Sequence, residues 1–150
     1  MGVEKEKLKY MRRILYIIFL TLFFVLFPSC DSKWGENGDL DGMWQLTQWK
    51  DIASGQFIEN ESEDIYYSFQ LKLVKFQMIG SGKYYLSYFT HQGNDLIIGK
   101  TVQWPKNEER PLSELKTLGV PADGRFHIDV LNDKNMVLRS ETSILSFRKY

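Results

Sequence analysis

The sequence predicts an all-β domain, an antiparallel up-and-down meander of about seven or eight strands with one short helix. Two observations support this prediction. Segments rich in aromatic and branched residues recur throughout residues 42–150, and tight turn sequences separate them. A meander with this many strands closes into a barrel or packs as a sandwich.

The strand-forming segments follow one another from residue 43 to the C-terminus. Three turn sequences separate neighbouring segments: Gly80-Ser81-Gly82, Gln92-Gly93-Asn94 and Asn132-Asp133-Lys134. The segments are MWQLTQWK (43–50), IYYSFQLKLVKFQM (65–78), KYYLSYFTH (83–91), DLIIGKTVQW (95–104), RFHIDVL (125–131), NMVLRSE (135–141) and SILSFRKY (143–150).

Successive side chains of a strand point to opposite faces, so period two assigns the faces. In segment 65–78 the apolar set changes phase at Val74, which indicates a β-bulge or a strand end that is buried on both sides. The same-face sets elsewhere are Trp44 and Leu46; Phe126, Ile128 and Val130; Met136 and Leu138; and Leu145 and Phe147.

One short helix interrupts the meander. Leucines at 112, 115 and 118 form an apolar stripe between Pro111, which favours a helix start, and Gly119, which favours a helix end. So short a helix is marginal alone, and we expect it to lie across one open end of the barrel.

The first thirty residues have the layout of a secretory signal. Basic residues precede an apolar run at 14–27, which is shorter than the roughly 20 residues of a transmembrane helix. Ser29 and the single cysteine, Cys30, then indicate a bacterial lipoprotein leader. We expect removal of residues 1–29 and acylation of Cys30, which anchors the chain in a lipid membrane. The alternatives are an uncleaved anchor or a buried helix, and Met11 is an alternative start.

Cleavage changes the charge of the chain. Of the 19 basic and 19 acidic residues, the leader holds five and two, which leaves 14 and 17 in the mature chain. A mildly acidic domain lacks the basic surface of a nucleic-acid-binding protein. Residues 30–41 are predicted to be the lipidated cysteine and a polar tether, ahead of a domain at 42–150. We expect the protein at the bacterial cell envelope, lipid-anchored in the outer membrane.

The sequence contains no catalytic motif, so we expect no enzyme activity and no cofactor. His91 and His127 have no third ligand nearby in the sequence, and no cysteine is left for a metal site. The acidic residues of segment 59–64 lack the spacing of a calcium loop and are expected to be solvated.

Gly42-Met43-Trp44 opens the first strand, and this Gly-x-Trp sequence resembles the start of the lipocalin family. The leader, the meander and the terminal basic strand are similar to small bacterial lipocalin-like lipoproteins. The resemblance implies a lipocalin-like barrel over residues 42–150. It also implies that Trp44 packs across the closed end of the barrel against a basic residue of the last strand, for which Arg148 is the candidate.

An eight-stranded barrel either fills its interior with its own side chains or holds one small molecule. Two functions therefore remain open. The first is a membrane-tethered protein that binds a small apolar or amphipathic ligand, and the second is an interaction or structural module with a filled barrel that docks onto another envelope protein. A cavity would favour the first, and exposed tyrosines would favour the second. The candidate ligand-lining residues are Tyr67, Phe69, Tyr88 and Trp104.

The leader prediction has a direct test at Cys30. Replacement Cys30→Ala removes the thiol that accepts the acyl chains, so it should stop processing or release the protein from the membrane fraction. Mass spectrometry of the mature N-terminal peptide measures the modification. An unmodified Cys30 thiol in the processed protein would contradict the prediction.

Overall fold

The computed structural model describes residues 7–16, 35–58 and 64–150, which fall into two units, Met1–Lys33 and Trp34–Tyr150. In the first unit, residues 7–16 are helical. No helix within the described ranges is both long enough and apolar enough to cross a bilayer. Cys30 and most of the predicted leader lie outside the described residues, so their processing stays a prediction.

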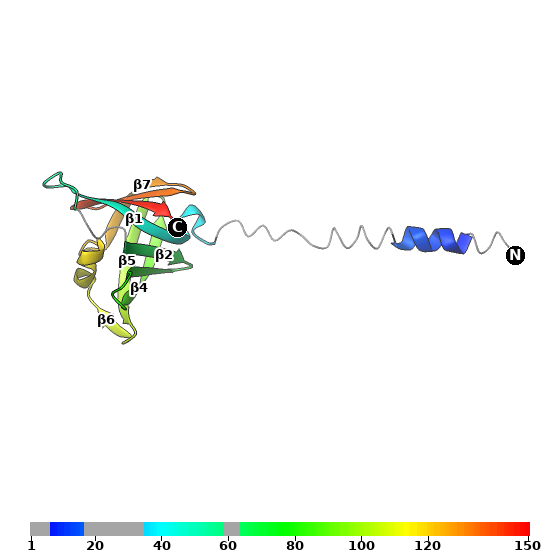
Figure 1. The fold of residues 1–150 in the computed structure, drawn as a ribbon, viewed down its shortest axis with the longest axis horizontal. Coiled ribbons are helices and arrows are strands. Elements are labelled where there is room, and N and C mark those ends of the chain that lie inside the picture. The colour runs from blue at the N-terminus through cyan, green and yellow to red at the C-terminus, as the bar shows by residue number, and fades with distance from the viewer. Residues whose placement is uncertain (1–6, 17–34, 59–63) are drawn as a thin grey trace. The chain divides into compact units, whose positions relative to one another are not determined.

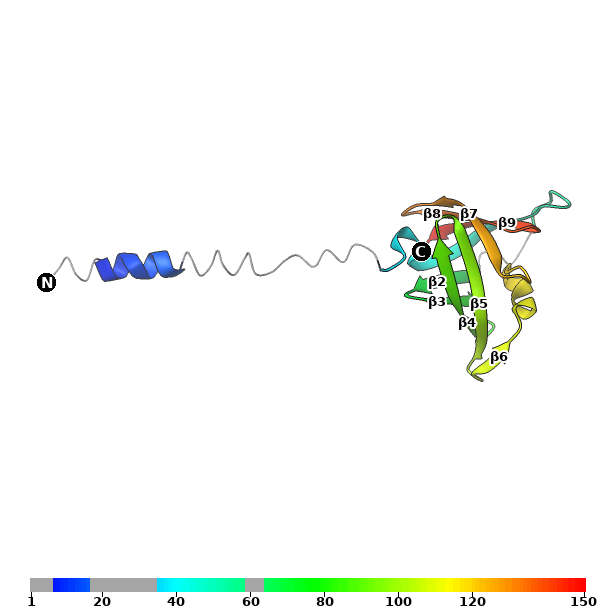
Figure 2. The same ribbon diagram turned by 180° about the vertical axis from the view of Figure 1, so that it is seen from behind.

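In the second unit, eight strands form a closed antiparallel ring (Figures 1 and 2). Each strand from β1 to β5 pairs with the next, β5 pairs with β7, and the chain continues through β8 to β9, which pairs with β1. The all-β barrel predicted from the sequence is confirmed. The strands are β1 (Gly42–Asp51), β2 (Ile65–Gln70), β3 (Leu73–Met78), β4 (Tyr84–Gln92), β5 (Asp95–Trp104), β6 (Glu108–Arg110), β7 (Arg125–Leu131), β8 (Asn135–Arg139) and β9 (Ser143–Lys149).

The strand β6 stands outside the ring and was not predicted from the sequence. It pairs with the last part of β5, from Thr101 to Gln103, whereas β7 pairs with the first part, from Asp95 to Ile97. One edge of β5 therefore changes partner from β7 to β6, while the other edge pairs with β4 along the strand. Figure 2 shows β6 beside the far end of β5.

The phase change in segment 65–78 comes from a hairpin turn, so both expectations for it were wrong. The segment folds into β2 and β3, joined by Leu71 and Lys72, and Phe69 pairs with Val74 across the turn. Directly paired residues share a face, which places both of these side chains inside. The turn contains no glycine, and Leu71 itself adopts a left-handed φ of 56°.

Within the described strands, three β-bulges reverse the alternation of side chains. The pairing register places an extra residue at Thr47 in β1, between Ile98 and Thr101 in β5, and at Asp129 in β7. Beyond each bulge the inward positions change parity. Val130 is consequently exposed, and its predicted place beside Phe126 and Ile128 was wrong.

The end of the barrel near η1 (Gly38–Leu40) is closed by Trp44. Its indole is fully buried, and its Nε1 donates a hydrogen bond of 2.8 Å to the carbonyl oxygen of Leu40. Leu40 is itself fully buried in the core. The described part of the predicted tether, residues 35–41, therefore belongs to the folded domain, and the predicted boundary at residue 42 was wrong.

Lys149, and not the expected Arg148, lies over the ring of Trp44. The Lys149 Nζ is 4.8 Å from the ring centroid, and the two residues are directly paired between β1 and β9. Arg148 points to the opposite face, where its Nε donates to Gln45 at 2.9 Å. Gly42 makes room for the lysine, because a Cβ there would come within 2.9 Å of the Lys149 Cε.

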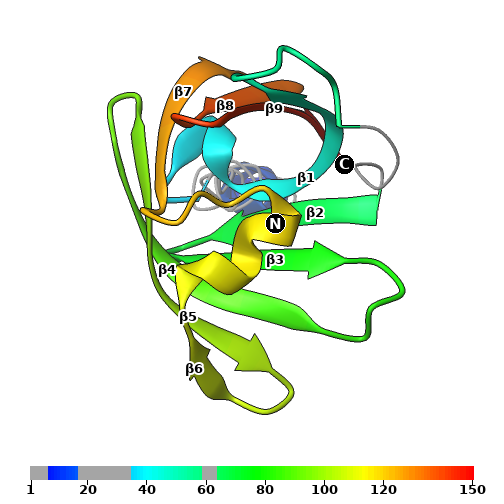
Figure 3. The same ribbon diagram turned by 90° about the vertical axis from the view of Figure 1, so that its left-hand side faces the viewer.

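The predicted short helix is confirmed as η3, a 3₁₀-helix at Leu112–Leu118. Pro111 precedes it, and Gly119 ends it in the left-handed conformation with a φ of 88°. Leu115 and Leu118 are buried against the barrel. Looking along the barrel, Figure 3 shows η3 across the near end, and Figure 1 places η1 and η3 at opposite ends.

Replacing Trp44 should strongly destabilise the domain. The change Trp44→Ala removes a fully buried indole and its cation–π contact, and is expected to lower the free energy of unfolding by about 3–5 kcal/mol. Urea unfolding followed by circular dichroism measures this. Trp104→Ala is the matched control, because Trp104 is largely exposed, and a similar loss in both variants would contradict the assigned burial.

Candidate functional site

The barrel interior is occupied by its own aromatic side chains. The ring of Tyr67 packs edge-on against Phe76 at 4.6 Å between centroids and lies 4.7 Å from Phe147. Phe69 packs edge-on against Phe89 at 5.2 Å. Both Tyr67 and Phe69 were candidate ligand-lining residues, and both point inward as expected, but they pack against other rings of the core.

Tyr88 and Trp104, the other two candidates, lie on the outer surface of the barrel. The bulge in β5 reverses the parity set by Leu96 and Ile98, so Trp104 faces outward. On β4, the inward residues include Ser87 and Phe89, which leaves Tyr88 on the outer face. The expected cavity wall shared by these residues was therefore wrong.

A cleft of about 530 Å³ lies at the η3 end of the barrel, and we call it the η3 cleft. It is bounded by the end of β1, by η3 with the segment that follows it, and by the turn between β8 and β9. Its lining residues are Trp49, Asp51, Ile58, Ser113, Lys116, Gly119, Val120, Pro121, Ala122, Asp123, Glu141, Thr142 and Ser143.

The η3 cleft combines an apolar floor with a charged rim. Trp49 and Val120 are two of its apolar residues, and its charged residues comprise three carboxylates and one lysine. One of the carboxylates is held in place, because Asp51 Oδ1 accepts hydrogen bonds from the hydroxyl and the backbone N–H of Ser54. These bonds hold the pKa of Asp51 below its ordinary value, so this carboxylate is ionised at neutral pH.

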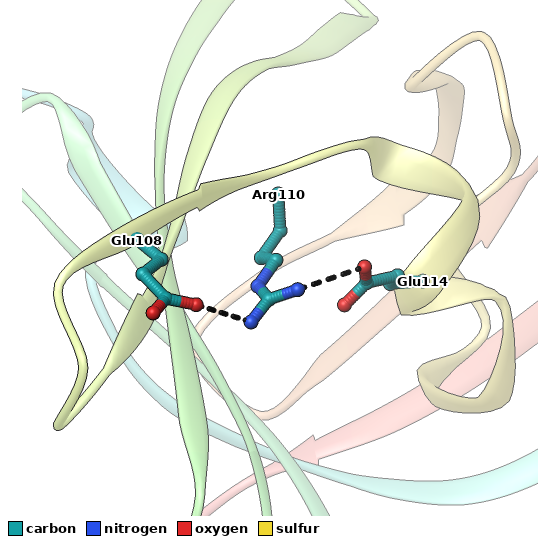
Figure 4. Close-up of polar contacts among 3 residues, drawn as sticks. All are labelled: Glu108, Arg110 and Glu114. Carbon is teal, nitrogen blue, oxygen red and sulfur yellow. Dashed lines mark hydrogen bonds and ion pairs between the residues drawn. The ribbon is translucent and has the colours of Figure 1, made fainter.

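The helix η3 is fixed over the barrel by two polar contacts. Inside, the Tyr67 hydroxyl donates a hydrogen bond of 2.6 Å to the Leu118 carbonyl oxygen. Outside, Arg110 of β6 forms ion pairs with Glu108 and with Glu114 of η3, as Figure 4 shows. These contacts set the position of the wall that η3 contributes to the cleft.

The two histidines lie outside the η3 cleft. A neighbouring cleft of about 360 Å³ includes His127, whose Nδ1 is 3.6 Å from the carboxylate of Asp95. The ring of His91 contacts the Gly93 carbonyl oxygen at 2.9 Å. Within the described ranges, no group of three or more His, Cys, Asp or Glu residues is placed to hold a metal ion. Of the acidic segment 59–64, the structure describes only Asp64.

No direct signal in the sequence predicted the η3 cleft. Counting by two from Trp44 and Leu46 places Trp49 on the outer face, whereas the bulge at Thr47 pairs it with the inward-facing Leu145. An extra residue in a strand leaves no mark in composition. The helix that forms one wall was the part of this site that the sequence did predict.

Comparison with known proteins agrees with the barrel fold described above. A family model described as a lipocalin-like domain matches residues 22–150. A lipocalin-like protein from Bacteroides uniformis is 22% identical with a TM-score of 0.56, covering 75% of this chain and 100% of that chain. An uncharacterized protein from Bacteroides eggerthii is 25% identical with a TM-score of 0.55, over 74% and 99% of the two chains. No curated protein matches the chain.

The Tyr67 hydroxyl gives a prediction for stability against pH. Burial raises the pKa of Tyr67 above its ordinary value, so its contribution to stability is complete below about pH 10 and falls as the pH rises further. The change Tyr67→Phe should remove this alkaline loss and cost about 1–3 kcal/mol at neutral pH, because the Leu118 carbonyl loses its donor. Urea unfolding at neutral and alkaline pH measures both effects. Tyr88→Phe is the exposed control, and an equal effect of the two changes would contradict the assignment.

Proposed function

Because the chain belongs to the family of lipocalin-like domains, we propose that it is a non-catalytic binding protein anchored at the bacterial cell envelope. The η3 cleft is the proposed site for a small amphipathic ligand. The observation that supports this choice is the size of the cleft, about 530 Å³, together with its apolar floor. Ligand sites commonly have volumes of roughly 300–1,000 Å³ and mostly apolar walls.

The position of the ligand differs from the barrel interior expected from the sequence. Tyr67, Phe76 and Phe147 pack against one another there, and a ligand inside would have to displace them. Displacement of packed rings from a core carries a large energetic cost. The η3 cleft needs no such rearrangement, because it lies apart from these packed rings.

The charged rim indicates which amphipathic ligand fits the cleft. Asp51, Asp123 and Glu141 outnumber Lys116, so the rim is net negative. A small apolar molecule that carries an amine or another cationic group would pair with these carboxylates. A fatty acid would be repelled by them.

A titration tests this proposal. The domain, residues 31–150, is titrated with a long-chain amine and with a fatty acid of equal length while tryptophan emission is followed. The variant Trp49→Phe should lose the emission change if the ligand binds in the cleft. Saturable binding of the amine is expected, because Trp49 offers an apolar contact for its chain and the rim carboxylates can pair with its charged group. The variant Glu141→Lys should weaken it about tenfold, equivalent to about 1.4 kcal/mol.

The matched control for Glu141→Lys is Asp133→Lys, a similar charge change in the exposed turn between β7 and β8. It should leave binding of the amine unchanged. Equal weakening by the two variants, or tighter binding of the fatty acid than of the amine, would contradict the site.

A second candidate function is docking onto another component of the cell envelope. The occupied interior and the exposed Tyr88 and Trp104 support it. Large aromatic side chains that contribute nothing to the core are common at contact surfaces. Under this function the chain is an anchored interaction module, and its partner contacts the outer face of the barrel.

A further inference from the structure

The outer face of β3, β4 and β5 displays a continuous group of apolar side chains. Cross-strand pairs join Leu73 to Tyr88, and Tyr84 to Trp104. Between these two rows, Leu86 pairs with Val102. Together with Leu71 in the preceding turn, these residues form the outer patch: Leu71, Leu73, Tyr84, Leu86, Tyr88, Val102 and Trp104.

The outer patch is well exposed, and contacts within the domain already hold some of its side chains in place. Leu71 and Tyr88 are each 58% exposed, and Trp104 is 45% exposed. The rings of Tyr84 and Trp104 stack at 6.1 Å, and the Lys75 Nζ lies 5.7 Å from the Tyr84 centroid. Contiguous apolar surface of this kind on a small domain indicates a contact site.

Lysines surround the outer patch. Residues 65–106 contain five lysines, no arginine and a single acidic residue, Asp95, although the mature chain as a whole is acidic. Asp95 pairs with His127 of β7, at the end of β5 away from Trp104. One lysine, Lys100, forms an ion pair of 2.9 Å with Glu109. The other lysines leave this side of the barrel positively charged.

The chain enters the barrel beside the outer patch. The side-chain amide of Asn37 donates a hydrogen bond of 2.7 Å to the Leu71 carbonyl oxygen. Five residue steps separate Cys30 from Gly35, where the described part of the barrel unit begins, and they span at most about 18 Å even when extended. Any anchor at Cys30 therefore holds the Leu71 end of the patch near the membrane.

We propose that the outer patch rests on the surface of a bilayer that carries anionic lipids. This inference builds on the proposed function, because it assumes that the N-terminal segment attaches the chain to that bilayer. Trp and Tyr rings favour the level of the headgroups, and lysines there pair with anionic headgroups while their stems cover apolar surface. The patch is thus a second membrane contact beside the anchor.

This orientation leaves the η3 cleft accessible. The patch covers β3, β4 and β5, whereas the cleft is lined by β1, η3 and the turn between β8 and β9. In the ring, β2 and β7 separate β1, β8 and β9 from the strands of the patch, and η3 crosses one end of the barrel (Figure 3). A barrel that lies on the membrane through the patch can therefore still take a ligand at the cleft.

Site-specific labelling tests the inference. If Cys30 is acylated, an added cysteine is the single reactive thiol, so Tyr88→Cys can carry an environment-sensitive fluorophore. The full chain is purified from membranes and reconstituted into vesicles of phosphatidylcholine, with and without an equal part of phosphatidylglycerol. Ser146→Cys on β9 is the control, since β9 lies opposite β4 in the ring. Leu73→Cys repeats the measurement at a second patch position.

The label at position 88 should be quenched by a lipid nitroxide at headgroup depth, about fivefold more than the label at position 146 in the anionic vesicles. The double variant Lys72→Glu/Lys75→Glu should abolish the difference, whereas Lys134→Glu should not. Equal quenching at positions 88 and 146 would overturn the inference. So would a thiol at position 88 that, before labelling, is shielded from an aqueous maleimide in native membranes but reacts with it in vesicles, which would assign the patch to a protein partner.

Flotation of the same vesicles separates the two proposals. A chain that floats with the vesicles but keeps its label in water is anchored and does not use the patch, so the inference alone fails. A chain that does not float with the phosphatidylcholine vesicles contradicts the proposed anchoring. Its flotation with the anionic vesicles and its quenching at position 88 then decide the patch on their own.

Discussion

Closure of the eight-stranded ring is the constraint on which the rest of this structure depends. A closed barrel has one interior of fixed size, and each strand offers it only the side chains of one face. Here Trp44, Tyr67, Phe69 and Phe76 take up that space together with aliphatic residues. The interior also holds the rings of other buried phenylalanines, whereas Tyr88 and Trp104 lie on the outer surface.

The two ends of the barrel are closed by different means, and both depend on residues of the interior. At one end, the Trp44 indole donates a hydrogen bond to the Leu40 carbonyl oxygen, and Lys149 lies over its ring. At the other end, η3 is held from inside by the Tyr67 hydroxyl and from outside by Arg110. The shape of the η3 cleft is therefore coupled to core packing, so a change at Tyr67 would affect stability and the cleft together.

The proposed functions follow from the same occupied interior. Side chains that a roomier barrel would use to line a cavity are displayed on the outer surface, where Tyr88 and Trp104 belong to an apolar patch among lysines. The proposed ligand site lies instead at the end of the barrel beside η3. In this arrangement, the proposed membrane contact at the outer patch and the proposed ligand site at the η3 cleft are separate.

The sequence by itself determined the all-β class, most of the turns and the limits of η3, because tight turns, period two and helix-end residues are local signals. Through the resemblance of Gly42-Met43-Trp44 to the lipocalin family, it also predicted that Trp44 is buried at one end of the barrel. The tertiary structure decided which side chains face inward beyond each bulge, which reversed Trp49, Trp104 and Val130. It also decided that Lys149 covers Trp44, since pairing register is a relation between strands that no single segment specifies.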